Sequence, residues 1–149
     1  MLNKTVSLIV TITGFIFLLS SCKTYYISVD SFKQQFAAVD TLKLKQVTTM
    51  GPGGDKVKYE TNPIEIIKCV DSKGNAAELK NSPSIEIRFT YNNNNKRTVF
   101  YFDLISVNDS SITGIQSRFI PSIRKMISIN SIKKIEVQDG KKKFRYVDR

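Results

Sequence analysis

The chain has 149 residues, of which 41% are hydrophobic, and its 23 basic residues outnumber the 13 acidic ones for a net charge of +10. This length suits one ordinary domain with a hydrophobic core of its own. The sequence contains no histidine, which excludes Ser/His and Cys/His catalysis, histidine general bases and most zinc sites. Because it also lacks a glycine-rich phosphate loop, a CxxC pair and an Asp-rich calcium loop, we predict neither a metal nor a cofactor.

The first 22 residues have the features of a secretory signal. Lys4 is the only charged residue before Cys22, and a largely apolar segment over 6–19 follows it. A helix over this segment would be about 21 Å long, short of the roughly 30 Å of hydrocarbon that a spanning helix must cross. Cleavage of the segment is therefore favoured over a permanent transmembrane anchor.

Residues 19–22, Leu-Ser-Ser-Cys, resemble the bacterial lipobox, in which an aliphatic residue and two small residues precede a cysteine. The resemblance implies that the Cys22 thiol receives a diacylglyceryl group and that residues 1–21 are removed. A secreted protein cut after Ser21 and an uncleaved short anchor are the alternatives. Since two or three acyl chains hold a protein on a membrane almost permanently, we expect attachment to the lipid bilayer through Cys22.

We expect three segments: a lipoprotein signal peptide over 1–21, a short lipidated tether over 22–27 and one β domain over 28–149. The domain opens with a predicted helix over 28–36, because Phe32 and Phe36 lie one turn apart on the same face. Ser28 is a suitable N-cap for this helix.

After the helix, the apolar periodicity changes to two, which is typical of strands. Strands are predicted over 42–47, 57–60, 64–70, 77–80, 85–91, 98–107, 112–118, 127–129, 132–137 and 141–147. Residues 98–107 are apolar on both faces except at Asp103, which predicts a central strand. Gly114 is expected to mark a bulge, residues 119–125 to form a loop, and Asp139-Gly140 to turn a hairpin.

Short strands, one short N-terminal helix and no alternation with long helices predict an all-β, antiparallel domain. We expect a meander that closes as a small barrel or sandwich, because an open sheet leaves its edges exposed. The chain is rich in Ile, Lys, Asn and Ser and is similar to small uncharacterised envelope lipoproteins of the Bacteroidota, a grouping that implies no activity. No acidic cluster follows Cys22, which resembles the members facing the periplasm, so we expect the periplasmic face of the outer membrane.

Basic residues near the C-terminus form the first candidate site. We interpret six of them as an anionic-surface binding site: Lys133, Lys134, Lys141, Lys142, Lys143 and Arg145. Each basic residue near an anionic surface contributes about 1 kcal/mol. The expected partners are anionic lipid, lipopolysaccharide, a glycan or an envelope protein, whereas nucleic acid is not expected outside the cytoplasm. The alternative is a solvated face that keeps the protein soluble.

Two functions stay open from the sequence. We favour a membrane-anchored, non-catalytic binding or structural module for a protein partner or an anionic envelope polymer. The alternative is a small envelope hydrolase with a carboxylate pair, for which Asp103 and Glu65 are candidates because each interrupts an apolar run. The opposing interpretation is that both carboxylates point to solvent.

Two further residues carry smaller predictions. The tripeptide over residues 40–42, Asp-Thr-Leu, resembles the O-glycosylation pattern of exported Bacteroidota proteins, which makes Thr41 a candidate site. Cys69 is the one thiol left once Cys22 is acylated, and its apolar neighbours indicate a buried strand thiol. A reactive or intermolecularly paired thiol is the alternative.

Overall fold

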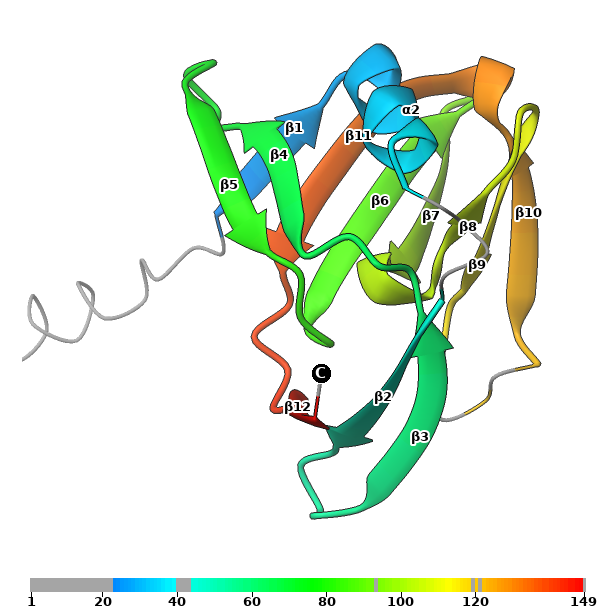
Figure 1. Ribbon diagram of the computed structural model, residues 1–149. Helices are drawn as coiled ribbons and strands as arrows, with labels where there is room; N and C mark the ends of the chain where they lie inside the picture. Colours follow the sequence, from blue (N-terminus) through cyan, green and yellow to red (C-terminus); the bar gives the residue numbers. More distant parts are fainter. Residues whose placement is uncertain (1–22, 40–43, 93, 119, 121, 149) are drawn as a thin grey trace, which may run out of the picture.

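The computed structural model describes residues 23–39, 44–92, 94–118, 120 and 122–148, and it confirms an all-β domain with one short helix (Figure 1). The elements in chain order are β1 (Thr24–Ile27), α2 (Val29–Ala37), β2 (Lys45–Met50), β3 (Lys56–Thr61), β4 (Ile66–Val70), β5 (Ala76–Lys80), β6 (Ile85–Tyr91), β7 (Lys96–Tyr101), the 3-10 turn η2 (Phe102–Leu104), β8 (Ser106–Val107), β9 (Ser111–Ile115), β10 (Arg124–Ser128), the 3-10 turn η3 (Ile129–Ser131), β11 (Ile132–Asp139) and β12 (Arg145–Asp148).

The strands form three antiparallel sheets. The largest has six strands in the order β5-β4-β1-β11-β6-β7, and the two others are β10-β9-β8 and β12-β2-β3. The described strands leave these sheets open and do not close them into one barrel. Among the described residues no helix is long and apolar enough to cross a membrane.

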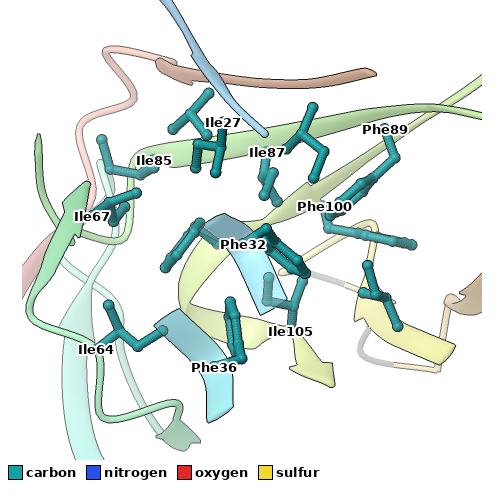
Figure 2. Packing of buried hydrophobic residues seen from close by; sticks show 14 of the residues in the cluster. Ile27, Phe32, Phe36, Ile64, Ile67, Ile85, Ile87, Phe89, Phe100 and Ile105 are labelled. Carbon is teal, nitrogen blue, oxygen red and sulfur yellow. The ribbon is translucent and has the colours of Figure 1, made fainter. Parts of the chain in front are cut away.

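One hydrophobic core joins the six-stranded sheet, the β10-β9-β8 sheet and the helix. The predicted Ser28 cap is confirmed, because its hydroxyl accepts a hydrogen bond from the Ser31 amide at 3.1 Å. The helix buries Phe32 and Phe36, and the Phe32 ring meets the β6 residue Phe89 edge-on at 5.6 Å (Figure 2). The strand β6 alternates as predicted, with Ile85, Ile87, Phe89 and Tyr91 buried. Its inward side chains therefore form the floor on which α2 packs.

The tether predicted over 22–27 is too long, because Thr24–Ile27 is the strand β1. It pairs with β11 along its length, with Tyr25 opposite Val137 and Ile27 opposite Ile135. Ile27 is 5% exposed, and Tyr25 packs against the core. Tyr25 and Ile27 lie two residues apart, on the face of β1 that packs on the core, so the folded domain begins at Thr24.

The central strand predicted over 98–107 is also wrong. The strand β7 is an edge of the six-stranded sheet and ends at Tyr101, where the chain turns through η2. Phe102 and Asp103 are both buried in this turn, and the short β8 then joins a different sheet. Residues 98–107 are mostly apolar because their first part packs in the six-stranded sheet and their last part packs in the β10-β9-β8 sheet.

Asp139-Gly140 does not make the predicted hairpin. The strand β11 already pairs with β1 on one edge and β6 on the other, so it has no free edge for β12. The chain leaves the sheet through Gly140, whose amide donates to the Ser84 carbonyl, and through Lys141, which has a φ of 48°. It then pairs β12 with β2 in the third sheet.

The predicted bulge at Gly114 is replaced by a packing contact. Gly114 pairs in regular register with Lys125 of β10, so part of the loop predicted over 119–125 is strand. A methyl group on Gly114 would overlap the buried Phe100 ring, at 2.7 Å from both Cδ atoms. Glycine is required here for the close approach of β9 to β7.

We predict that Gly114→Ala lowers the free energy of unfolding by about 1–3 kcal/mol, because Phe100 has no room to move in a close-packed core. Gly53→Ala is the matched control, since its nearest neighbour is the flexible Asp55 side chain at 3.0 Å, and it should change stability by less than about 0.5 kcal/mol. Denaturant unfolding measures both. Equal stability of the two variants would contradict the packing explanation.

Candidate functional site

The candidate site is built around Asp103 of η2, whose side chain is 0% exposed. The solvent-facing alternative is therefore wrong for this residue. Arg118, three residues beyond β9, donates from Nη2 to Asp103 Oδ1 at 2.5 Å, and its side chain is only 7% exposed. A buried charge is costly unless it is paired and hydrogen-bonded, and here each ion supplies the other's counter-charge.

The guanidinium of Arg118 is held by further contacts. Its Nε and Nη2 donate to the Pro83 carbonyl at 3.1 and 2.8 Å, and its Nη1 donates to the Tyr59 hydroxyl at 2.6 Å. Its plane lies over the Tyr101 ring, with Cζ 4.2 Å from the ring centre. Arg118 thus has a fixed position and a balanced charge.

The third sheet supplies hydroxyl groups to the same carboxylate. Tyr59 and Tyr146 donate to Asp103 Oδ2 at 2.9 and 2.8 Å, and Thr49 donates to the Tyr59 oxygen at 2.7 Å. Thr49 is opposite both Tyr146 and Val57 in the sheet, so these side chains share one face. That face is laid over Asp103 and Arg118.

Burial beside the Asp103 carboxylate also changes the pKa of the Tyr59 hydroxyl. Desolvation, followed by the negative charge of Asp103, raises the pKa of Tyr59 to about 12. The raised pKa favours the neutral phenol, which is the form that donates to Asp103.

A cavity of about 560 Å³ lies against this network. Arg118 and Tyr59 form part of its wall, and most of the rest is apolar or backbone. The lining consists of Thr49, Gly51, Pro52, Gly53, Asp55, Val57, Lys58, Tyr59, Leu104, Ile115, Ser117, Arg118 and Phe144. A volume of this size is typical of small-molecule sites.

The proposed carboxylate pair does not form around one cleft. Glu65 is 66% exposed and pairs with Lys45 at 3.0 Å, whereas Asp103 is sealed against Arg118. An acid and base pair needs two carboxyl groups that reach one substrate, so this geometry does not favour the hydrolase alternative.

The six predicted basic residues do not form one surface patch. Lys133 and Lys134 stand at the start of β11, and Lys141 to Lys143 follow its end. At about 3.4 Å per residue, the five residues of β11 that follow Lys134 place the end of the strand roughly 17 Å from Lys134. Lys134 also pairs with Glu136 at 2.9 Å.

Within the C-terminal group, Lys142 is committed to internal contacts. Its Nζ lies 2.5 Å from Glu86 and donates to the Tyr101 hydroxyl at 2.9 Å. Burial lowers its pKa, but these partners outweigh burial and the pKa is raised overall. Lys143 and Arg145 instead line a second cavity, beside the first.

Other predicted sites have different outcomes. Cys22, the signal over 1–21 and Thr41 lie outside the described residues.

Cys69 is a buried free thiol, as predicted, and burial followed by the charge of Glu78 raises its pKa. The described part of the chain holds no group of three or more Cys, Asp or Glu side chains suited to a metal ion.

Sequence reasoning found Asp103 and missed its partners. The signal for Asp103 was a charge inside an apolar run. Arg118 sits in a polar stretch with no such signal, and Tyr59 and Tyr146 read as ordinary strand residues. The roles of these residues depend on how the sheets pack against one another, and local sequence patterns do not contain that information.

Comparison of the chain with protein-family models, curated proteins and solved structures gave no match. Inference about function therefore starts from the site itself.

We predict that Asp103→Asn costs about 3–5 kcal/mol of unfolding free energy, because it leaves the Arg118 cation buried without a counter-charge. Glu65→Gln is the matched control, since it removes a carboxylate from an exposed pair worth at most about 1 kcal/mol. Thermal and denaturant unfolding of both variants test this. Similar losses in the two variants would show that Asp103 does not balance a buried charge.

Proposed function

We propose that the protein is a membrane-anchored cell-envelope lipoprotein whose β domain is a non-catalytic binding module. Its partner in this proposal is a protein or an anionic envelope polymer, and its location is the periplasmic face of the outer membrane. The lipobox resemblance of residues 19–22 supports the anchor. The cavity beside Arg118 is the observation that carries the binding role.

The state of the charged groups at the cavity favours binding over catalysis. Asp103 is bonded to Arg118 and to two tyrosine hydroxyls, so its oxygens are engaged in holding the fold. A general acid or base must reach the proton that it transfers. The cavity wall therefore offers a ligand apolar contacts, and Asp103 holds the wall in place without taking part in proton transfer.

An anchor at Cys22 would hold this module close to the bilayer. Only Lys23 separates Cys22 from β1, and a residue spans at most about 3.6 Å. In Figure 1 the described chain enters β1 on the left, while β2, β3 and β12 lie at the bottom. The proposal thus places the cavity on a domain with almost no tether.

We predict that Cys22→Ala abolishes metabolic lipid labelling and moves the protein from the membrane to the soluble fraction. Without acyl chains, the roughly 0.8 kcal/mol per buried methylene that holds it is lost. Cys69→Ala is the matched control, because Cys69 is the buried core thiol, and it should keep both label and membrane attachment. Retention of Cys22→Ala in the membrane fraction would refute the anchor.

A further inference from the structure

Two adjoining cavities meet at Phe144. The inner one, of about 560 Å³, and the outer one, of about 400 Å³, both have Gly51, Pro52 and Phe144 in their walls. Phe144 packs on Gly51, where an added Cβ would lie 3.3 Å from its ring. The two spaces therefore adjoin at the β2–β3 turn and the segment before β12, and the pair of cavities together is called the groove below.

The inner part of the groove suits an uncharged, apolar group. Val57, Leu104 and Ile115 contribute apolar side chains from three different elements. Val57 is 55% exposed although it shares a face with the buried Thr49. Arg118 offers no net charge because Asp103 balances it. Covering this apolar surface with an apolar chain removes it from water, which favours binding.

The outer part of the groove suits an anion. Lys143 and Arg145 line it together with Met50, and both cations are exposed. Arg145 donates to the Met50 sulfur at 3.6 Å, a weak acceptor. Neither cation forms a salt bridge with another described residue, in contrast to Lys142. No described residue neutralises these two cations at the mouth of the groove, so this end of it can bind an anion.

The remaining charges of the groove cancel. Asp55 and Lys58 both line the inner cavity, and both are exposed. The net charge of the whole groove therefore comes from Lys143 and Arg145, at its outer end.

We propose that this groove binds a single-chain amphiphilic anion, a molecule with an apolar chain and a negatively charged head such as a fatty-acid carboxylate. The chain lies in the inner cavity against Val57, Leu104 and Ile115, and the head lies between Lys143 and Arg145. This inference rests on the proposed binding role of the cavity and goes beyond the protein or polymer partner proposed above, because it adds a small ligand. An apolar polymer or a head group alone would satisfy only one end of the groove.

Calorimetric titration of the purified full chain with decanoate, below the concentration at which it forms micelles, tests the proposal. Decanol serves as the chain without the charge and acetate as the charge without the chain. We expect decanoate to bind with at least about tenfold higher affinity than decanol, because the two cations attract the carboxylate and not the uncharged alcohol. Acetate should not bind measurably.

Two pairs of variants separate the contributions. Lys143→Gln with Arg145→Gln should lower decanoate affinity about tenfold or more and leave decanol affinity unchanged. Lys73→Gln with Lys133→Gln removes the same charge from exposed positions outside the groove and should leave both affinities unchanged. Val57→Trp should fill the inner cavity and weaken both ligands, whereas Val70→Trp, on β4, should weaken neither.

Three outcomes would overturn the proposal. They are equal affinity for decanoate and decanol, an equal loss in both glutamine double variants, and no binding of decanoate by the folded chain. Circular dichroism confirms that each variant is folded. Because Cys22 labelling is measured separately, failure to bind decanoate with an intact lipid anchor would reject the ligand and leave the anchored module standing.

Discussion

The arrangement of this domain depends on the buried ion pair between Asp103 and Arg118. Removing two charges from water costs several kcal/mol per ion, and only good geometry with additional hydrogen bonds offsets it. Here Tyr59, Tyr146 and the Pro83 carbonyl complete the bonding of both ions. Because the partners come from η2, from the chain after β9 and from the third sheet, the pair is satisfied only when these parts meet in one arrangement.

The same network prepares the groove. The third sheet is held by its hydroxyl groups over Asp103, which leaves Val57 beyond the covered area and open to solvent. Arg118 closes the base of the cavity as a neutralised group, so the free positive charge of the region lies at Lys143 and Arg145. A buried pair that fixes the fold and an exposed pair of cations that selects a ligand are thus separate features of one site.

Local patterns in the sequence predicted the features that depend on residues close together along the chain. The alternation of β6 and the Ser28 cap are both present. The failures concern long-range pairing. Asp139-Gly140 has hairpin chemistry, but β1 and β6 occupy both edges of β11. Asp103 was recognised as unusual, yet Tyr59 lies 44 residues away from it along the chain, and nothing nearby indicates the contact.

A double-mutant cycle on the ion pair tests the central claim most directly. Unfolding free energies are measured for Asp103→Leu, Arg118→Met and the double variant. If the two charges balance each other in the core, each single variant leaves an unpaired ion. The loss of unfolding free energy in the double variant is then smaller than the sum of the two single losses by about 2 kcal/mol or more. Losses that add to within about 0.5 kcal/mol would contradict the account, because the two residues would then stabilise the fold independently.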